Sequence, residues 1–412
     1  MTISPDLLKD KKILLGVTGS IAVYKSLELV RLFVKAGAQV RVIMSESAKK
    51  FVTPLSFETL TSNAVLDDTN ESWVSDHNHI KSGEWADIFV VAPATANTMA
   101  KLAHGVADTM LTQSLLAYTG GKILAPSANT NMLYNPITQK NIVTLIESGY
   151  TILGTQVKEL ACKTRGDGAM AEPLEIFYAT ARELLREQFW SERGVIISGG
   201  GTIEKIDDVR YLSNFSSGKM ASALATALYL RGANVTLVAS RHESDIPNAV
   251  QIEKVQSSQE MQKSLQQALY SAKEQTKKTP YLFMAAAVSD YTPADLHCGK
   301  LKKEQLGESF TLKMNKNRDI LASLEKKECI AIGFKAEMDA LNAMQNATNM
   351  LHKKGLDGVC LNILESDKSF GTDTNAIEFI THDGVKTIPS ASKLSVAFSI
   401  AAHAQKTENS QE

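Results

Sequence analysis

Two stretches in different halves of the chain follow the same local plan. In each, a short apolar run ends at a turn, and a segment with apolar residues at helical spacing follows. The helix ends at Gly-Ala before a second apolar strand, as in LFVKAGAQVRVIMS (Leu32–Ser45) and LYLRGANVTLVAS (Leu228–Ser240). This order of strand, helix and strand predicts a parallel sheet covered by helices. We therefore expect two α/β domains with mostly parallel sheets, residues 1–190 and 191–412.

The overall composition excludes several classes of protein. The chain has 412 residues and a net charge of -1, and no Lys/Arg cluster interleaves with aromatic residues, so nucleic acid is not an expected partner. No apolar run approaches the length of a membrane span, and the first residues lack the apolar core of a signal peptide. The four cysteines are widely spaced, which argues against a zinc site or a disulfide framework. A cytoplasmic enzyme is expected.

Turn-forming residues separate the helices and strands that the sequence predicts. In the first half we expect strands at residues 12–17, 39–44, 87–92, 122–125 and 150–153, and helices at 136–148 and from 175 to about 190. The glycine-containing stretch 162–170 is expected to be a loop. In the second half we expect strands at 195–198, 281–288, 310–314, 329–334 and 357–361, helices at 258–274 and 339–352, and a hairpin around residues 382–384. Residues 291–306 are expected to be loose, and the tail after His403 is expected to fray.

Polar residues in the first half gather where strands end. The turn after the first strand, GVTGS, contains Gly19 and Ser20, and Thr95 and Asn97 follow the strand at residues 87–92. In a parallel sheet these carboxyl ends lie at one edge, where open α/β proteins bind ligands. The turn does not match G-x-G-x-x-G, so a mononucleotide is expected rather than a dinucleotide.

The stretch VRYLSNFSSGKM (Val209–Met220) precedes an apolar helical run in the second half. Its hydroxyl groups, its amide and the free N–H groups of a helix start form a place suited to phosphate. A plain serine cap on an ordinary helix is the alternative. The nucleotide-hydrolase phosphate loop is excluded by spacing, because Ser213 and Met220 occupy its required Gly and Ser/Thr positions.

Other candidate groups are individually weak signals. His77 and His79 have no matching Cys or carboxylate pattern, so unpaired loop residues are the alternative to a metal site, and one of them could serve as a base. Cys162 lies beside basic residues that would lower a thiol pKa, although it could be an ordinary small residue. Further candidates are two asparagines after the strand at 122–125 and the lysines of KLKK, namely Asn129, Asn131, Lys300, Lys302 and Lys303.

Taken together, these motifs resemble one family over nearly the whole chain. In the first half they are GVTGSIAVYK, HIKSGEWAD, APATANTMAKLAHGVAD, PSANTNM and ACKTRGDGAM; in the second they are VRYLSNFSSGKM, AAAVSDY, KLKK and GFKAE. In this order the chain resembles the bifunctional phosphopantothenoylcysteine decarboxylase/phosphopantothenate–cysteine ligase family of coenzyme A biosynthesis. Nine motifs in family order are a specific signal.

For the first half, the resemblance implies a flavodoxin-like, Rossmann-like domain that binds FMN and usually forms trimers with sites between subunits. The family oxidises the cysteinyl thiol of phosphopantothenoylcysteine, loses carbon dioxide and reduces the resulting enethiol, giving 4'-phosphopantetheine. By position, His79 matches the catalytic histidine, Asn129 the asparagine that grips the leaving carboxylate, and Cys162 the proton donor. The implied FMN residues are Gly19, Ser20, Ser45, Thr95 and Asn97.

For the second half, the resemblance implies a Rossmann-like ligase domain that works as a dimer. It activates 4'-phosphopantothenate with CTP and Mg²⁺, forms an acyl-cytidylate, and lets the amine of cysteine attack. Asn214 matches the asparagine that handles this intermediate, and Lys300 the first lysine of the family's K-x-K-K. The implied CTP residues are Ala285, Ala286, Asp290, Lys300, Asn317, Asp319, Phe334 and Lys354, whereas the Mg²⁺ ligands are not identified.

The chain also departs from the family pattern. Non-family residues stand at the pocket floor, in the decarboxylase lid and near the CTP residues, namely Ala128, Lys163, Ala169, Arg318 and Met350. Two alternatives follow: an electron-transferring flavoprotein, and a regulatory binding protein in which only the ligase half is active. The combination of His79, Asn129 and Cys162 argues against simple electron transfer, which needs none of them.

Overall fold

The computed structural model describes residues 3–160, 163–302, 308–364 and 371–409. The chain divides into two compact units, one running from Ile3 to Leu185 and the other beginning at Arg186. Each unit has its own sheet and its own buried apolar cluster. The α/β class with mostly parallel sheets is confirmed.

The first unit is built on a parallel sheet with the strand order β2-β1-β3-β4-β5. Its central strand β3, IFVVAPA, is buried throughout, as expected for a strand covered on both faces. The chain passes from β1 outward to β2 and then crosses to β3 on the other side of β1, so the strand order reverses between β1 and β3. The strands are β1 (Lys12–Val17), β2 (Gln39–Met44), β3 (Ile88–Ala94), β4 (Gly121–Pro126) and β5 (Tyr150–Ile152).

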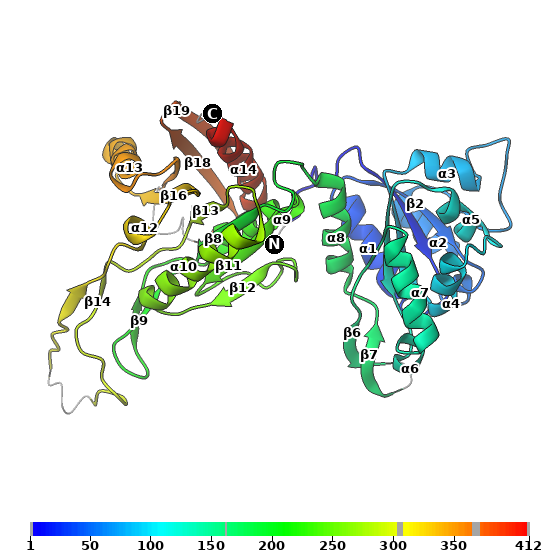
Figure 1. Ribbon diagram of the computed structural model, residues 1–412, viewed down its shortest axis with the longest axis horizontal. Helices are drawn as coiled ribbons and strands as arrows, with labels where there is room; N and C mark the ends of the chain where they lie inside the picture. Colours follow the sequence, from blue (N-terminus) through cyan, green and yellow to red (C-terminus); the bar gives the residue numbers. More distant parts are fainter. Residues whose placement is uncertain (1–2, 161–162, 303–307, 365–370, 410–412) are drawn as a thin grey trace. The chain divides into compact units, whose positions relative to one another are not determined.

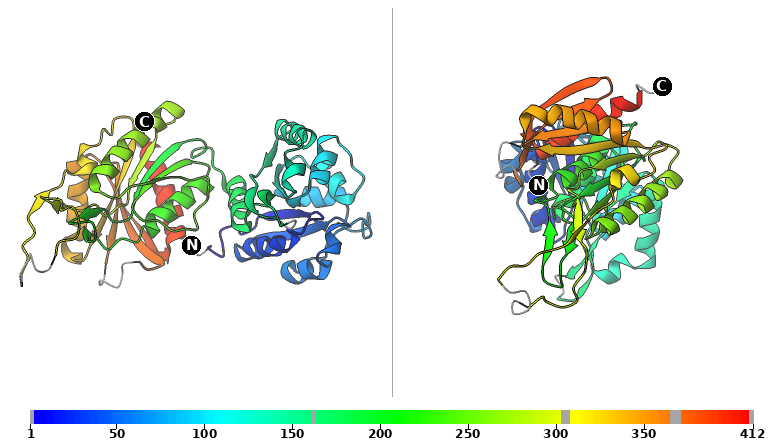
Figure 2. Two further views of the ribbon diagram at one scale, coloured as in Figure 1. Left: turned by 90° about the horizontal axis from the view of Figure 1, so that it is seen from below. Right: turned by 90° about the vertical axis from the view of Figure 1, so that its left-hand side faces the viewer.

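Helices cover both faces of this sheet (Figures 1 and 2). On one face α1 and α8 pack together through the rings of Phe33 and Phe177, whose centroids are 5.7 Å apart. On the other face α4, α5 and α7 bury Met99, Leu115 and Leu145 against the strands. The helices are α1 (Val23–Lys35), α2 (Pro54–Thr61), α3 (His79–Trp85), α4 (Ala96–Ala103), α5 (Met110–Ala117), α6 (Thr130–Leu133), α7 (Pro136–Glu147) and α8 (Pro173–Leu185), with a short 3₁₀ turn η1 (Ala48–Lys50).

The second unit has an eight-stranded sheet with the order β12-β11-β8-β13-β16-β17-β18-β19. Its strands are parallel up to β17, and the predicted terminal hairpin adds β18 and β19 antiparallel. Here the strand order reverses between β8 and β13. The strands are β8 (Gly194–Gly199), β11 (Asn234–Ala239), β12 (Gln251–Lys254), β13 (Tyr281–Met284), β16 (Ile330–Glu337), β17 (Gly358–Ile363), β18 (Thr374–Thr381) and β19 (Gly384–Ser392).

Helices again cover both faces. Contacts join α9 to α14 on one side of the sheet, whereas α10 and α13 contribute Met261, Leu265, Ala343 and Ala347 to the apolar cluster on the other side. The helices are α9 (Lys219–Leu230), α10 (Ser258–Gln275), α12 (Ile320–Ser323), α13 (Ala340–Lys354) and α14 (Lys393–Asn409).

Two small antiparallel sheets extend from the main sheet of the second unit as an arm, residues 203–213, 291–302 and 308–316 (Figure 1, lower left). They pair β9 (Ile203–Lys205) with β10 (Tyr211–Ser213), and β14 (Tyr291–Pro293) with β15 (Met314–Lys316). The expected strand at 310–314 is wrong, because the strand begins only at Met314. The expected loose segment is wrong at Tyr291–Pro293, which form β14, and is confirmed at residues 294–302, which have no helix or strand. Phe310 is 45% exposed, so the apolar residues from Phe310 onward do not form the buried face of a strand.

The prediction for stretch 162–170 was also wrong. Residues Arg165–Ala169 form β7, which pairs with β6 (Gln156–Glu159) as an antiparallel hairpin. Turn-forming residues are accommodated there because the strand lies close to α6: a Cβ on Gly166 would lie 2.3 Å from Oγ1 of Thr130. Close backbone approach therefore explains glycine within a strand.

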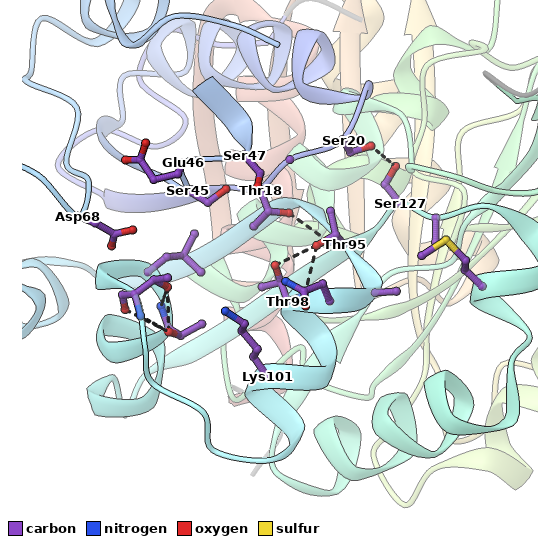
Figure 3. Close-up of a pocket in the computed structure, with 18 residues that line it drawn as sticks. Thr18, Ser20, Ser45, Glu46, Ser47, Asp68, Thr95, Thr98, Lys101 and Ser127 are labelled. Atoms are coloured by element: carbon purple, nitrogen blue, oxygen red, sulfur yellow. Dashed lines mark hydrogen bonds between the residues drawn. The ribbon is translucent and has the colours of Figure 1, made fainter. Parts of the chain in front are cut away.

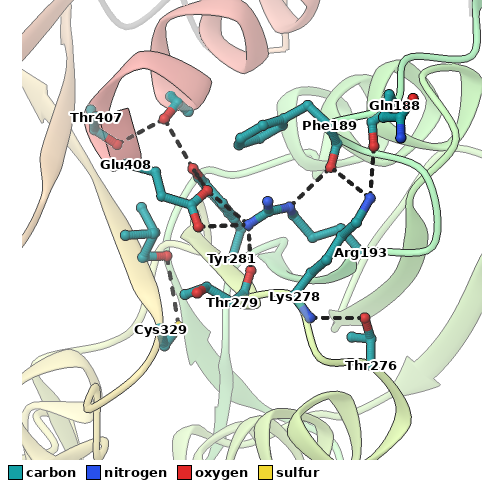
Figure 4. Close-up of polar contacts among 12 residues, drawn as sticks. Gln188, Phe189, Arg193, Thr276, Lys278, Thr279, Tyr281, Cys329, Thr407 and Glu408 are labelled. Carbon is teal, nitrogen blue, oxygen red and sulfur yellow. Dashed lines mark hydrogen bonds and ion pairs between the residues drawn. The ribbon is translucent and has the colours of Figure 1, made fainter. Parts of the chain in front are cut away.

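Two helix predictions also needed correction. Helix α8 ends at Leu185 rather than near Trp190, which is buried in the second unit against the ring of Tyr281. Fraying from His403 is wrong for the described residues, because α14 continues to Asn409 and buries Ala404. Near its end the carboxylate of Glu408 lies 2.8 Å from Nη1 of Arg193, whose guanidinium also covers the ring of Phe189 (Figure 4).

Candidate functional site

A cavity of about 510 Å³ lies where the strand order of the first unit reverses (Figure 3). Its walls come from the carboxyl ends of four strands, and all five residues implied as the FMN region line it. After β1 the lining residues include Gly19 and Ser20, after β2 Ser45, and after β3 Thr95 and Asn97. Open α/β sheets of this strand order bind ligands at this point, because loops from neighbouring strands diverge there.

Hydroxyl groups join the strand ends around this cavity. Thr18 Oγ1 donates to the carbonyl of Pro93 at 2.7 Å and accepts from the N–H of Thr95 at 3.1 Å, which ties β1 to β3. Thr95 Oγ1 accepts from the N–H of Thr98 as the cap of α4, so the start of α4 faces the cavity. A helix start with surrounding hydroxyl groups attracts a phosphate.

Gly19 permits a close approach between the loops after β1 and β2. A Cβ on Gly19 would lie only 2.4 Å from Cβ of Ser47, too close for any side chain. Nearby, the hydroxyl oxygens of Ser20 and Ser127 are 2.9 Å apart. Hydroxyl groups dominate the lining of the cavity at the switch between β1 and β3, and the carboxylates of Glu46 and Asp68 also lie in its walls. The hydroxyl groups and the start of α4 fit a phosphate-bearing flavin.

Sequence analysis did not identify several lining residues. Ser127 follows β4 and could have been found by applying the strand-end rule to that strand. Lys101 lies one helical turn after Asn97 on α4 and pairs with Asp108 at 2.6 Å. Other lining residues carry no strand-end signal, because they lie in the loops before α3 and α5 or within the helices α5 and α6; they include Asp68, Thr109, Thr112 and Met132.

The other three residues implied for the first half do not converge with this cavity in the described part of the chain. His79 begins α3, and its Nδ1 lies 2.6 Å from Oε1 of Glu71. The hydrogen bond from His79 lowers the pKa of the Glu71 carboxyl. Asn129 caps α6 by accepting from the N–H of Asn131, next to the lining residue Ala128. Cys162 lies outside the described residues.

The second unit also has a cavity where its strand order reverses, with a volume of about 220 Å³. Ala285 and Ala286 after β13 and Phe334 of β16, all implied CTP residues, line it. The opposite wall is the loop before α9, within the stretch Val209–Met220. Three lysines also line the cavity, and the sequence alone assigned no role to any of them: Lys219, Lys335 and Lys393.

Further implied residues form a chain of contacts beside this cavity. Asn214 donates through Nδ2 to the carbonyl of Val288 at 3.2 Å. Asn317 donates from its backbone to the carbonyl of Asp290 at 2.8 Å. Asp319 pairs with Lys354 at 2.8 Å, and none of Asp290, Asn317, Asp319 and Lys354 is among the described residues that line the cavity.

Lys300 lies on the arm, and a buried carboxylate anchors the arm beside it. Asp207 accepts hydrogen bonds from the N–H groups of Val209, Arg210 and Leu301 at 2.8, 2.6 and 3.1 Å, and from the Arg210 guanidinium. Burial alone would raise the pKa of Asp207, but these hydrogen bonds lower it well below its ordinary value. Asp207 thereby joins the segment of the arm that carries Lys300 to the segment that leads to Asn214.

Two departures from the family pattern have visible structural settings. Lys163, where the family has Gly, has a φ of +61°, a conformation that favours glycine. Met350, where a lysine is usual, packs against the apolar cluster of the second unit, and its Cε would lie 2.8 Å from a Cβ on Gly333. Met350 is therefore a packing residue in this chain.

Comparisons with known proteins cover both units. Residues 1–185 match the family model described as Flavoprotein, and residues 190–407 match the one described as DNA/pantothenate metabolism flavoprotein C-terminal domain. The coenzyme A biosynthesis bifunctional protein CoaBC of Haemophilus influenzae is 37% identical over 398 residues, which are 95% of this chain and 96% of that protein. The chain belongs to the CoaBC family. The CoaBC protein of Bacillus subtilis is 39% identical over 402 residues, 96% of each chain.

Among solved structures, a PPC decarboxylase mutant complexed with pantothenoylaminoethenethiol is 34% identical to the matched part of this CoaBC family member. The match covers 42% of this chain and 97% of that chain, with a TM-score of 0.39. Within the described residues, no helix is long and apolar enough to cross a membrane. No group of three or more His, Cys, Asp or Glu side chains among them could hold a metal ion.

Proposed function

We propose that this chain catalyses two consecutive steps of coenzyme A biosynthesis. The second unit joins cysteine to 4'-phosphopantothenate through an acyl-cytidylate formed from CTP with Mg²⁺. The first unit decarboxylates the resulting phosphopantothenoylcysteine to 4'-phosphopantetheine with FMN. The observation that carries the proposal is the pair of cavities at the two strand-order reversals, combined with family membership over both units. Its free cysteines, Cys298, Cys329 and Cys360, fit a reducing cytoplasm.

In the first unit, the hydroxyl groups of Ser20, Ser45 and Thr95 and the start of α4 would hold the FMN phosphate. Bound flavin supplies two-electron redox chemistry at the cysteinyl thiol, which eases the loss of carbon dioxide. Asn129 would hold the leaving carboxylate, and Cys162 would return a proton. Glu71 fixes the ring of His79 through Nδ1, which leaves Nε2 for the substrate.

We propose that a second copy of the chain completes the decarboxylase site. His79 does not line the FMN cavity of its own chain among the described residues, whereas Ala128, beside Asn129, does. Trimers with sites between subunits would bring His79 of one copy to the cavity of another. Ligase dimers would likewise bring the Lys300 of one copy to the other's nucleotide cavity.

In the second unit, Ala285, Ala286 and Phe334 would contact CTP, with Asp290, Asn317, Asp319 and Lys354 beside them. The carboxylate of 4'-phosphopantothenate and the triphosphate of CTP are both anionic and repel each other. Three lysines in the cavity walls would reduce this repulsion and allow both groups to bind close together. Lys300 would stabilise the negative charge that develops as pyrophosphate leaves. Asn214, held at the carbonyl of Val288, would position the acyl-cytidylate.

The test is mass spectrometry of the products from 4'-phosphopantothenate, cysteine, CTP and Mg²⁺. Phosphopantetheine is expected, from a purified protein with a flavin spectrum. Accumulated phosphopantothenoylcysteine would contradict the decarboxylase half and favour the alternative of a flavoprotein with an active ligase half. A folded, colourless protein that takes up no FMN would contradict the flavin assignment.

A further inference from the structure

A second cavity lies along the carboxyl edge of the sheet in the second unit. Strands β8, β11 and β12 end at the same level, because Ala239 pairs with Gly199 on one side and with Lys254 on the other. Beyond these ends the cavity has a volume of about 900 Å³. Its polar lining comes from the turn after β11, the end of β12 and the loop before α9, and it includes Ser217, Ser240, Arg241, His242 and Lys254.

Two glycines bring the turn after β11 against the start of α9. Gly218 has a φ of +77°, and a Cβ there would lie 2.0 Å from the carbonyl oxygen of Arg241. Gly200 also has a φ of +77°, and its Cβ would lie 2.4 Å from Oγ of Ser240. Neither position has room for a side chain, so the close approach is part of the fold.

Hydrogen bonds fix the same turn. Ser240 Oγ donates to the carbonyl of Gly201 at 2.6 Å, and the N–H of Glu243 donates to Oγ of Ser222 on α9 at 3.0 Å. Arg241 therefore projects from a fixed backbone, and its Nη2 lies 3.3 Å from the hydroxyl of Tyr211 on the arm. The fixed turn therefore holds the guanidinium of Arg241 in one place at the cavity.

The charge balance of this cavity favours an anion. Arg241 and Lys254 are cationic, and Nδ1 of His242 lies 2.7 Å from the carbonyl of Glu243, which leaves Nε2 for a ligand. Among the described lining residues, Glu260 is the one carboxylate. Its Oε2 already accepts the N–H of Gln256 at 2.7 Å as part of the start of α10.

We propose that this cavity binds the phosphate-bearing end of a substrate of the second unit. This inference rests on the proposed ligase function, because Ser217 lines both this cavity and the nucleotide cavity. A substrate whose reacting group lies at Asn214 can extend past Ser217 along the same sheet edge. Arg241 suits a phosphate because its guanidinium offers paired N–H donors, and Lys254 adds a point charge. The phosphomonoester of 4'-phosphopantothenate and the triphosphate of CTP share this chemistry.

The experiment compares Arg241→Gln and Lys254→Gln with the wild type by pyrophosphate release. The matched control is Lys263→Gln, an exposed lysine of α10 that does not line the cavity. Each protein is assayed with two acid substrates, 4'-phosphopantothenate and pantothenate, which lacks the phosphate. The CTP concentration is varied with each acid. We expect each cavity variant to lose about tenfold or more in kcat/KM, because a hydrogen bond to a charged phosphate is lost.

The pattern of the loss identifies the source of the phosphate. A smaller preference for 4'-phosphopantothenate over pantothenate assigns the cavity to the phosphomonoester. A raised KM for CTP with both acids assigns it to the triphosphate. The inference would be overturned if kcat/KM of both cavity variants lay within twofold of the values for the wild type and for Lys263→Gln with every substrate.

Calorimetric titration with inorganic pyrophosphate separates this inference from the ligase proposal. If the wild type releases no pyrophosphate with any acid, the ligase proposal fails, but the cavity is still tested. Pyrophosphate binding that weakens about tenfold in Arg241→Gln and is kept in Lys263→Gln supports an anion cavity. No binding, or equal binding by all three proteins, overturns it.

Discussion

The two units place their cavities at the same point of the fold but line them with different side chains. Each places a cavity where the strand order reverses, between β1 and β3 in the first unit and between β8 and β13 in the second. The first cavity is surrounded mainly by hydroxyl groups, with the carboxylates of Glu46 and Asp68 also in its walls, and its lysine, Lys101, is paired with Asp108. The second has Lys219, Lys335 and Lys393 in its walls and no carboxylate among the described residues that line it, although Lys219 pairs with Asp373 at 2.6 Å and Lys335 with Glu337 at 3.2 Å. The backbone therefore fixes where a ligand lies, and the side chains fix how much negative charge it carries.

The independence of the two units is tested most strongly at the end of α14. Glu408→Ala would leave the nearly buried guanidinium of Arg193 without its carboxylate, and removal of one partner from a buried pair costs about 3–5 kcal/mol. We expect the thermal transition of the second unit to fall, while flavin in the first unit is released at an unchanged temperature. Glu84→Gln, in an exposed pair with Lys81, serves as the control and should change neither transition. A common fall of both transitions would contradict independence.

Lys300→Gln tests the difference in charge. Loss of a cation that stabilises the departing pyrophosphate is expected to slow pyrophosphate release by about 100-fold or more, with flavin content unchanged. Lys313→Gln, at an exposed lysine on the same arm outside KLKK, is the matched control. Normal ligase turnover in Lys300→Gln would remove this residue from the site.

Gly19→Val tests the close approach of the loops after β1 and β2 at the first cavity. The new side chain would collide with Ser47, and overpacking of this kind costs about 1–3 kcal/mol, so FMN affinity should fall about 10–100-fold. The ratio of flavin to protein absorbance measures the loss, and pyrophosphate release should continue unchanged. Full flavin content in Gly19→Val would show that the loops after β1 and β2 do not enclose the cofactor.

Asp207→Asn tests whether the arm needs its anchor. The amide accepts fewer of the hydrogen bonds that reach Asp207, so Lys300 should be held less firmly and ligase kcat should fall about tenfold. Because folding lowers the pKa of Asp207, its stabilisation is present above the ordinary pKa of 3.8 and is lost as pH falls through the lower folded value. The ratio of variant to wild-type activity should therefore stay constant above about pH 5. A ratio that changes between pH 6 and 8 would exclude this carboxyl as the cause.

The sequence predicted the strands around the two cavities because they are apolar and end at turn residues. β1 and β2 begin and end as expected, and the strand-end rule placed Gly19, Ser20, Thr95 and Asn97 together. For the second cavity, the local pattern supplied the loop before α9, whereas the resemblance supplied Ala285, Ala286 and Phe334. Its alanines, Ala285 and Ala286, carry no chemical signal of their own.

Other features depend on contacts between distant residues. Helix α14 was missed because its buried face relies on small residues such as Ala397, Ala401 and Ala404, which give weak periodicity. The arm was missed because β14 and β15 are three residues each and are held by pairing across a long sequence separation. The distance of His79 from the cavity depends on chain packing, which a motif does not encode.

The contact between Arg193 and Glu408 also determines the order in which the chain can mature. The two residues are 215 positions apart, at opposite ends of the second unit. During synthesis the first unit has all of its strands and helices before α14 exists, so it can fold and take up flavin while the ribosome is still extending the chain. The second unit can close only after residue 408 has emerged. A truncation within α14 should therefore leave a flavin-binding protein whose second unit remains open to proteases.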